Sequence, residues 1–409
     1  MKTSWQTKKL GEVCNVFADG DWIEKKDQSS EEIRLVQTGN VGNGAFKDRG
    51  EKARYISEKT FKRLRCTEIM PGDCLISRLP DPVGRSCIIP DTGQKMITAV
   101  DCTIIRFQKE TILSRWFVYY SLSQKYQNQI NKQVSGATRQ RISRNNLGFI
   151  GIPLPSLHTQ HRIVKLLDEV FEKTAKAKEN AEKNLQNAKE LFESYLQNVF
   201  ANPGKDWEEK RLGETCSFVR GPFGGNLKKS YFKPSGIAVY EQKHAIYDQF
   251  KEIRYFIDEK KFNEMRRFEV FHGDLIMSCS GTMGKVSIVP NNVRKGIINQ
   301  ALLKLTPGKD LLAKFLKIWM ESPNFQEQIA KYSQGAAIKN VASVKILKEI
   351  NVQVPSISEQ KNIIVKIDEF SAKTKKLKKI YQQKLFDLEE LKKSILQKAF
   401  NGEFAGVCS

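Results

Sequence analysis

The clearest pattern of apolar and polar positions in this chain lies in two segments that follow Pro155 and Pro355. In each segment, apolar or small residues recur at steps that mostly alternate between four and three. The two stripes are, in order, Ile163, Leu167, Val170, Thr174, Ala177, Ala181, Ala188, Leu191 and Tyr195, and Ile363, Ile367, Phe370, Thr374, Leu377, Tyr381, Leu388, Leu391 and Ile395. Such a heptad stripe is typical of the buried seam of a coiled coil. Neither segment contains an internal Pro or Gly, so we expect two helices of about 40 residues, each roughly 60 Å long at 1.5 Å per residue.

The two helices are expected to run antiparallel. The first ends at Asn202-Pro203-Gly204, a stop signal that passes the chain to a second globular domain within a few residues. The second helix then begins from that domain with its own apolar seam to bury, and it can pair with the first seam only by running in the opposite direction. The sequence therefore predicts an antiparallel coiled coil with a globular domain at each end, related by a pseudo-two-fold axis.

Outside these helices the pattern is typical of mixed α and β structure. Short β-branched runs such as DCTIIRF and KVSIVP are broken by Gly, Pro and Asp, and aromatic-rich stretches such as SRWFVYYSLSQKYQNQI have helical character. A chain of 409 residues with 40% apolar residues is long enough for at least two cores. We predict an α+β fold with two similar α/β globular domains. The expected ranges are a first domain at 1–156, a first spacer helix at 157–201, a second domain at 202–357, a second spacer helix at 358–404 and a tail at 405–409.

The whole chain is an internal repeat with a period near 200 residues. KKLGEVC after Trp5 matches KRLGETC after Trp207, PGDCLIS at 71–77 matches HGDLIMS at 272–278, and VGRSCIIP at 83–90 matches MGKVSIVP at 283–290. VSGATRQRI at 134–142 corresponds to SQGAAIKNV at 333–341. Each copy closes alike, with ELFESYLQNVF ending at Phe200 and ELKKSILQKAF ending at Phe400. One folding unit is therefore expected twice.

The formal charge of +22 points to a polyanionic partner, because so large an excess repels itself unless it is neutralised. Residues 1–156 and residues 202–357 each hold 25 Lys and Arg against 16 Asp and Glu, a net +9. The first spacer helix is neutral, and residues 358–409 carry +4. Double-stranded DNA, whose successive turns present equivalent grooves about 34 to 36 Å apart, fits two basic domains held apart by a spacer. A solvated basic surface without a partner is the alternative.

Cysteine usage and apolar run lengths bear on the compartment. Eight cysteines are scattered without a C-x-x-C pair, and no basic-then-apolar leader opens the chain. No run approaches the roughly 18 to 20 uninterrupted apolar residues of a membrane span. We expect reduced thiols in a soluble cytoplasmic protein without a membrane partner.

The motifs of catalysis are missing. A methyltransferase would need an [NDS]-P-P-[YF] loop, and Ser322-Pro323-Asn324-Phe325 lacks the second proline, so we expect a helix start there. The segment from Gly281 to Val286 has the wrong spacing for G-x-x-x-x-G-K-[ST] and is expected to be a turn between strands. His158 and His161 form an H-x-x-H without a second ligand pair. We expect a non-catalytic chain with no metal and no cofactor.

Residues for DNA contact are chosen for charge, hydrogen-bonding shape and loop position. Arg and Gln are the side chains best shaped for bidentate contacts with guanine and adenine edges in the major groove. In the first domain the candidates are Thr138, Arg139, Gln140 and Arg141, with Arg78 and Arg85 flanking a Pro-Asp-Pro turn. In the second domain they are Lys339, Asn340, Thr282 and Lys285, with Lys228 and Lys229 after a glycine-rich stretch. For each residue the alternative is a solvated loop charge.

The order of these motifs resembles the specificity subunit of type I restriction-modification systems. The resemblance rests on the P-S-x-x-x-Q-x-x-I-x-x-x-[LI]-D-E helix in two copies, with Pro155, Gln160, Asp168 and Glu169 in the first, and Pro355, Glu359, Gln360, Asp368 and Glu369 in the second. It implies that the globular domains are target-recognition domains and that the helices set half-site spacing and bind two methyltransferase subunits. A separate motor-nuclease restriction subunit would complete the enzyme. His158-Thr159 replaces Ser358-Glu359, which weakens the capping signature of the first copy.

Two functions stay open at this point. The first is a DNA-binding specificity subunit whose two domains recognise the two halves of a bipartite, gapped site. The second is a non-enzymatic scaffold whose basic ends bind two acidic proteins. Strong dependence of duplex binding on sequence separates them, because a scaffold would show none.

Overall fold

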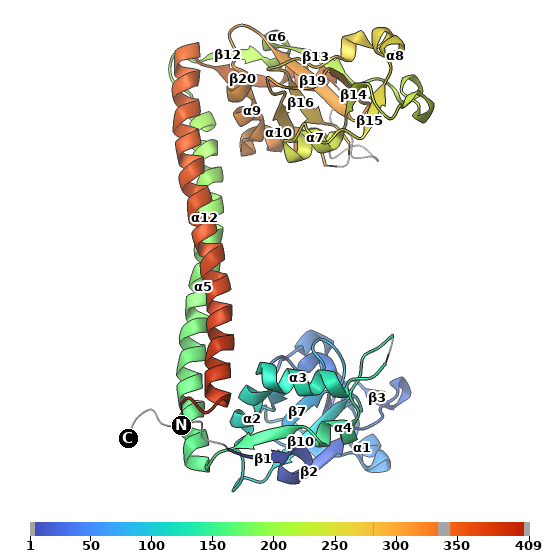
Figure 1. The fold of residues 1–409 in the computed structure, drawn as a ribbon, viewed down its shortest axis with the longest axis vertical. Coiled ribbons are helices and arrows are strands. Elements are labelled where there is room, and N and C mark those ends of the chain that lie inside the picture. Colours follow the sequence, from blue (N-terminus) through green and yellow to red (C-terminus); the bar gives the residue numbers. More distant parts are fainter. Residues whose placement is uncertain (1–4, 137, 281, 334–343, 405–409) are drawn as a thin grey trace. The chain divides into compact units, whose positions relative to one another are not determined.

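The computed structural model describes residues 5–136, 138–280, 282–333 and 344–404, which fall into two compact units (Figure 1). The first unit comprises residues 1–182 and 383–409, and the second comprises residues 183–382. Each unit holds one globular domain, together with part of each long helix. Helices and sheets are present in both units, so the expected α+β fold is confirmed.

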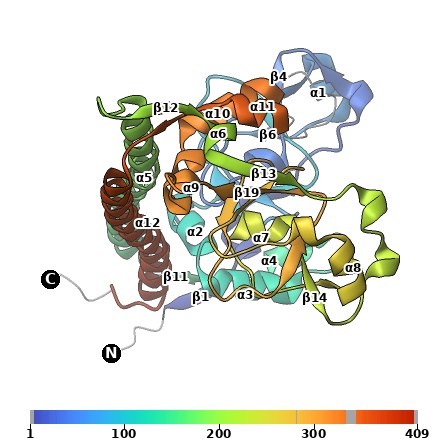
Figure 2. The same cartoon turned by 90° about the horizontal axis from the view of Figure 1, so that it is seen from above.

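The two long helices are α5 (Leu157–Ala201) and α12 (Ile357–Phe400), which lie side by side in Figures 1 and 2. Within the first unit, Arg162 donates to the carbonyl oxygen of Phe404 (2.9 Å) and Lys178 pairs with Glu389 (2.8 Å). Residue numbers therefore rise along α5 as they fall along the adjacent part of α12. Within the second unit, Tyr195 packs on Phe370 with ring centroids 4.4 Å apart. The predicted antiparallel pairing is confirmed.

The seam between the helices differs from the predicted stripe at three positions. Ile163, Leu167, Ala181 and Ala188 are buried as expected, as is Ile367 in α12. Leu191, Leu377 and Leu391 are exposed instead. Beyond Ala188 the step to the next partly buried position is four, to Phe192, and not three. Leu191 and Phe192 are both apolar, so the sequence alone does not show which of them is partly buried. In the structure it is Phe192, because the buried face of a straight helix drifts from a strict seven-residue repeat.

A buried glutamine fastens the start of each long helix to its own domain. Gln160 accepts a hydrogen bond from the backbone N–H of Leu113 (3.0 Å) and donates to the carbonyl oxygens of Thr111 (2.9 Å) and Pro155 (3.0 Å). Gln360 makes the same three bonds in the second unit, to Leu312, Asp310 and Pro355. Both glutamines are fully buried, so each helix start has a fixed position on its domain.

Serine caps both helix starts. The hydroxyl of Ser156 accepts from the backbone N–H of Thr159 (3.3 Å), and Ser356 does the same for Glu359 (3.3 Å). The first copy is therefore capped by its serine as the second is, although Thr159 replaces the glutamate of the capping signature.

The repeated L-Q-x-x-F sequence at the end of each long helix closes the core of a domain. Phe400 packs on Trp116 (4.8 Å between ring centroids) and Tyr120 (5.2 Å) in the first unit. Phe200 packs on Phe315 (5.7 Å) in the second unit. Burying an aromatic side chain of this size contributes about 2 to 3 kcal/mol. Each core is thus completed by the helix that ends in its own unit.

The first domain consists of two sheets and a two-stranded ribbon. A four-stranded antiparallel sheet has the order β2-β10-β7-β8, a five-stranded sheet has the order β3-β5-β4-β9-β6, and β1 pairs with β11. The strands are β1 (Gln6–Lys9), β2 (Cys14–Asp19), β3 (Gln28–Ser29), β4 (Ile33–Val36), β5 (Arg54–Ile56), β6 (Glu68–Ile69), β7 (Cys74–Ser77), β8 (Ser86–Ile88), β9 (Met96–Thr98), β10 (Cys102–Phe107) and β11 (Gly151–Leu154). The short helices are α1 (Glu58–Leu64), α2 (Ser114–Ser121), α3 (Gln124–Gln133) and α4 (Arg144–Gly148).

The second domain repeats this plan. Its sheets have the orders β13-β19-β16-β17 and β15-β14-β18, and β12 pairs with β20. The strands are β12 (Glu208–Arg211), β13 (Cys216–Arg220), β14 (Ile237–Tyr240), β15 (Tyr255–Ile257), β16 (Leu275–Ser278), β17 (Val286–Ile288), β18 (Gly296–Ile298), β19 (Leu302–Pro307) and β20 (Asn351–Val354). The short helices are α6 (Leu212–Thr215), α7 (Gln242–Tyr247), α8 (Glu259–Glu264), α9 (Ala313–Glu321), α10 (Pro323–Ser333) and α11 (Val344–Glu349).

Replacing Gln160 by Leu should destabilise the first unit by about 3 kcal/mol, because three buried backbone groups lose their partners at about 1 to 3 kcal/mol each before relaxation. Thermal denaturation and hydrogen exchange of the Leu113 amide would measure this. Gln186→Leu is the matched control, since Gln186 is an exposed residue of the same helix. Equal melting of the two variants, with the Leu113 amide still protected, would contradict the role given to Gln160.

Candidate nucleic-acid interface

The loops that carry most of the predicted DNA contacts of the first domain gather at one edge of its sheets. β2 ends where its antiparallel neighbour β10 begins, with Asp19 opposite Thr103, and β7 also ends there, with Ser77 opposite Cys102. The parallel strands β4 and β9 end at the same side. We call the resulting surface the first loop edge, defined as residues 20–24, 37–42, 78–85, 99–101 and the described part of 135–141.

Arg85 holds two of these loops together, 37–42 and its own loop 78–85. Its guanidinium donates to four backbone carbonyl oxygens, those of Val41 (2.7 Å), Leu79 (2.7 Å), Pro82 (3.1 Å) and Thr38 (2.8 Å). The side chain is only 8% exposed, and burial lowers its pKa. Because arginine stays protonated at neutral pH, its donors remain available to these carbonyls. Arg85 is therefore a buried support in this structure.

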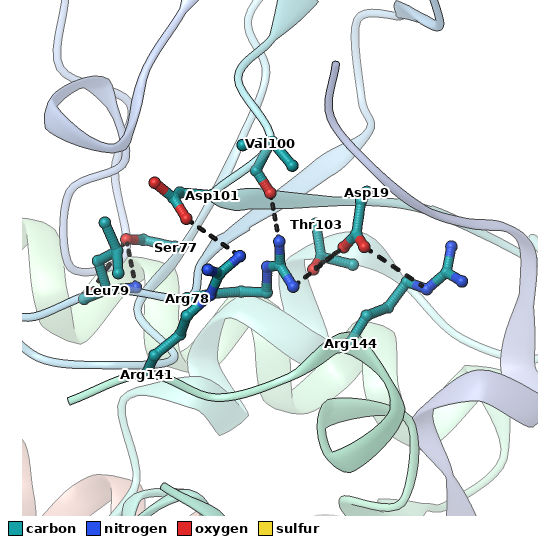
Figure 3. A network of polar contacts seen from close by, with 9 residues as sticks. All are labelled: Asp19, Ser77, Arg78, Leu79, Val100, Asp101, Thr103, Arg141 and Arg144. Atoms are coloured by element: carbon teal, nitrogen blue, oxygen red, sulfur yellow. Dashed lines mark hydrogen bonds and ion pairs between the residues drawn. The ribbon is translucent and has the colours of Figure 1, made fainter. Parts of the chain in front are cut away.

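Arg78 is the centre of a second network in the same edge (Figure 3). Its guanidinium donates to the carbonyl oxygen of Val100 and lies 3.4 Å from Asp19, which also faces Arg144 at 3.9 Å. The backbone N–H of Arg78 donates to the carbonyl oxygen of Asp101 (2.9 Å). The residue is 5% exposed, and burial lowers its pKa. Like Arg85, it reaches inward.

The other four candidates of the first domain are exposed. Reciprocal backbone bonds of 2.9 Å between Ser135 and Arg141 pin the two ends of the segment that carries them. Thr138, Arg139 and Gln140 are exposed within it. The guanidinium of Arg141 pairs with Asp101 at 3.2 Å, which fixes its direction (Figure 3). These four side chains are therefore accessible to solvent on the first loop edge.

The second domain has an equivalent surface, the second loop edge, defined as residues 221–229, 241–244, 299–301 and the described part of 279–285. It lies where β13 and β16 end and β19 begins, and where the parallel strands β14 and β18 end. Backbone bonds recur at matching positions. Cys279 donates to Ala301 in the second domain as Arg78 donates to Asp101 in the first. Two domains of different sequence thus share one loop scaffold.

The candidates of the second domain occupy this edge with exposed side chains. Lys285 takes the position of Arg85 but is exposed, as are Thr282, Lys228 and Lys229. Gln242 donates to the carbonyl oxygens of Ser280 and Thr282, the latter at 3.2 Å, and so supports the turn before Lys285. Lys339 and Asn340 lie outside the described residues.

Two buried side-chain polar atoms of the described chain lack a hydrogen-bond partner, Nε of Arg78 and Oε2 of Glu241. Buried polar atoms are almost always paired, so each such atom calls for an explanation. One belongs to each loop edge. Both edges therefore hold hydrogen-bonding capacity that the described residues leave unused.

The residues that orient the basic side chains have no signature in the sequence. Asp19 and Asp101 face arginines, and Gln242 supports a turn. An acidic residue in a basic domain gives no signal until the fold brings it to an arginine from a distant loop. Ser322 and Phe325 agree with expectation, because α10 begins at Pro323 and Ser322 caps it through the Phe325 N–H (3.4 Å).

No cluster of three or more His, Cys, Asp or Glu that could hold a metal ion is found in the described parts of the chain. Among the helices described, none is both long and apolar enough to cross a membrane.

Comparison with known proteins assigns the family. The family model for the type I restriction modification DNA specificity domain matches residues 2–186 and again residues 204–385. The chain belongs to this family. The two matches coincide with the two copies of the repeat, and the specificity-subunit function in type I restriction-modification systems follows from this membership.

Relatives of known function carry the same assignment along most of the chain. The EcoKI specificity subunit of Escherichia coli K12 is 24% identical over 409 residues, covering 93% of this chain and 85% of the relative. The EcoBI specificity subunit of Escherichia coli is 25% identical over 324 residues, covering 73% and 67%.

Solved structures share the fold. A chain from a study of complex assembly and conformational transition of the type I R-M system gives a TM-score of 0.79 at 19% identity, covering 98% of both chains. The HsdS subunit from Thermoanaerobacter tengcongensis gives 0.63 at 19% identity, again covering 98% of both.

Arg85 and Lys285 occupy equivalent positions, but truncating their side chains should affect stability very differently. Arg85→Ala removes donors from four backbone carbonyls and should lower the free energy of unfolding of the first domain by about 3 kcal/mol. Lys285→Ala should change the stability of the second domain by less than about 0.5 kcal/mol, because its side chain is exposed. Urea denaturation and limited proteolysis at 37–42 would test both, and a stable Arg85→Ala protein with an intact loop would refute the support role.

Proposed function

We propose that each domain of this specificity subunit recognises one half of a bipartite, gapped duplex site through its loop edge. The observation that carries the proposal is the same loop scaffold in two domains, occupied by different side chains. Exposed basic residues lie on both edges, and duplex DNA is the polyanion such surfaces bind. The long helices would then set the spacing of the half-sites.

In the first domain the readout is assigned to the exposed segment that carries Arg139, Gln140 and Arg141. Arg pairs with the N7 and O6 acceptors of guanine, and Gln pairs with adenine. Arg141 is already oriented by Asp101, which lowers the entropy cost of a directed contact. Thr138 adds a hydroxyl that can donate or accept.

In the second domain Lys228, Lys229, Lys285 and Thr282 are proposed to contact DNA, with Lys339 and Asn340 as further candidates. Lysine is a mobile point charge, so we assign the three described lysines to phosphates and not to base edges.

Arg78 and Arg85 are assigned a supporting role and not a direct DNA contact. Their burial and their bonds to backbone carbonyls support a role in holding the first loop edge in shape for DNA. A direct contact would require the guanidinium groups to leave these partners, at about 1 to 3 kcal/mol for each charged bond lost.

The two half-sites should differ in sequence. At equivalent positions the first edge has a buried Arg85 where the second has an exposed Lys285, and the loops after β2 and β13 share little beyond a glycine. An asymmetric target with unread base pairs in the middle follows from this divergence.

We further propose that the long helices bind two methyltransferase subunits and that motor-nuclease subunits complete the enzyme in the cytoplasm, this chain itself being non-catalytic. Exposed apolar side chains on α5 and α12 support a docking role. They are Leu166, Leu191, Val365, Leu377, Ile380, Phe386 and Leu391. Among the phenylalanines of these helices, Phe386 is exposed, whereas Phe200 and Phe400 are buried in domain cores.

Deleting the gene from its source strain tests the proposal as a whole. Long-read sequencing should show that one bipartite, gapped N6-methyladenine motif disappears from the genome and returns on complementation. A scaffold for acidic proteins would leave every methylated motif in place, provided that the other subunits are expressed.

Replacing Arg139 and Arg141 together by Ala should abolish recognition of one half-site, because the principal base-reading groups of the first edge are lost. Complementation of the deletion strain with this variant should leave the motif unmethylated, while copurification with the methyltransferase subunits is unchanged.

A charge-matched control is Lys9→Ala with Lys109→Ala. Lys109 follows the end of β10 and Lys9 lies near the start of β2, so both sit away from the first loop edge. This variant should methylate normally. Normal methylation by the Arg139 and Arg141 variant would instead show that the segment does not recognise DNA.

A further inference from the structure

Each loop edge presents one large aromatic residue at the same position of the repeat. Trp22 is 70% exposed and Phe223 is 84% exposed. Both follow a glycine by two residues, Gly20 and Gly221, which stand just after β2 and β13. The repeated sequence motifs do not include these aromatics, since Asp21-Trp22-Ile23 bears no resemblance to Pro222-Phe223-Gly224.

The glycines are fixed in the same way. The backbone N–H of Gly20 donates to the carbonyl oxygen of Cys102 (2.9 Å), and that of Gly221 donates to Leu302 (2.9 Å). A Cβ on Gly20 would lie 2.3 Å from the carbonyl oxygen of Ala99, so no larger residue fits. At Gly221 the corresponding distance to Asn299 is 1.9 Å. Each aromatic is thus carried by a loop whose base is pressed against the neighbouring strand connection.

Trp22 is held from both sides. Asp21 donates its backbone N–H to Thr98 (2.8 Å) and accepts from the backbone N–H of Thr67 (3.0 Å). Ile23 is partly buried and packs against a small hydrophobic core of the first domain. The carboxylate of Glu24 interacts with Lys26 and with the Trp22 side chain, and both lower the pKa of Glu24. The indole is positioned although most of its surface is left in water.

Phe223 stands between buried residues. Gly221 and Pro222 precede it in the interior, and Leu227 after it is buried in the core of the second sheet. Its carbonyl oxygen accepts from the backbone N–H of Asn226 (2.8 Å). A short, tied loop therefore holds the phenyl ring in solvent.

The folded protein gains little hydrophobic free energy from burying these two aromatic side chains. Burying an aromatic side chain of this size would contribute about 2 to 3 kcal/mol, which neither residue gains in the free protein. Other exposed aromatics occur singly, such as Phe149, whose ring lies under the ammonium group of Lys9, and Phe271, whose ring lies under that of Lys304. Only the pair at Trp22 and Phe223, among the described residues, repeats at equivalent positions on the loop edges.

We propose that Trp22 and Phe223 are wedges that enter the base stack of the duplex, one in each half-site. The inference rests on the proposed function and deepens it, because it assigns the two residues a deformation role that the basic side chains cannot supply. Proteins that insert an apolar side chain at a base step partially unstack it and kink the duplex. The sequence that unstacks most easily at that step is then favoured without a hydrogen bond to any base.

Purified full-length chain and a fluorescent duplex bearing the methylated motif would test the wedge. Trp22→Ala and Phe223→Ala should each weaken binding about 10- to 100-fold, the range of one lost base–aromatic contact. Trp22→Phe should stay within about three-fold of the wild type, because stacking tolerates a change of aromatic ring. Phe271→Ala is the matched control, since Phe271 precedes β16 whereas the second loop edge follows that strand. It should bind like the wild type.

Unstacking is measured separately with 2-aminopurine placed at each step of the motif in turn. Wild-type protein should raise the fluorescence at one step in each half-site, and Trp22→Ala should abolish the rise in one half-site only. Affinity within two-fold of the wild type, or weaker binding with the fluorescence rise unchanged, would overturn the wedge. The wedge would also be overturned if Trp22→Ala bound DNA normally but failed to copurify with methyltransferase subunits. Trp22 would then be a protein contact.

Failure of the proposed function is distinguishable from failure of the wedge. If gene deletion leaves every motif methylated, the function fails on its own, and the same variants are compared on mixed-sequence duplex DNA. If Trp22→Ala and Phe223→Ala bind mixed-sequence duplex DNA as tightly as the wild type, the wedge is overturned as well. Thermal denaturation checks that Trp22→Ala folds, which its exposure leads us to expect.

Discussion

The attachment of each long helix to its domain is the interaction on which the rest of this structure depends. Gln160 and Gln360 tie the helix starts by three buried hydrogen bonds each, and Phe200 and Phe400 close the cores at the helix ends. Within each unit, the buried glutamine and the aromatic closure therefore fix the domain on the parts of the long helices that belong to that unit.

The loop edges follow from strand geometry. In an antiparallel sheet the end of one strand lies beside the start of the next, so the loops after β2 and β7 and before β10 meet without any special sequence. The fold therefore brings these loops together without requiring particular loop residues. The side chains on the surface can then differ between the two domains. The two domains show this freedom, with Arg85 buried under one edge and Lys285 exposed on the other.

Charge alone does not make a recognition surface. The basic excess brings DNA to the protein from any direction, whereas Asp19 and Asp101 give Arg78, Arg141 and Arg144 fixed directions. Acidic residues in a basic domain thus serve to orient, and the first loop edge holds both signs within one network. Membership of the specificity family gives this arrangement its purpose, since recognising one sequence among many requires directed groups.

The repeat, the two long helices and their antiparallel pairing can be predicted from the chain alone, because heptad spacing, Pro155, Pro355 and Asn202-Pro203-Gly204 are local signals. The sequence also points to the exposed residues Thr138, Arg139, Gln140 and Arg141, and to Lys228, Lys229, Thr282 and Lys285. The folded chain was needed to show that Arg78 and Arg85 reach inward, that Leu191 and Leu391 lie off the seam, and that Trp22 and Phe223 share one position. Burial depends on which distant loops meet a side chain, and residues from separate strands meet only once the sheets have formed.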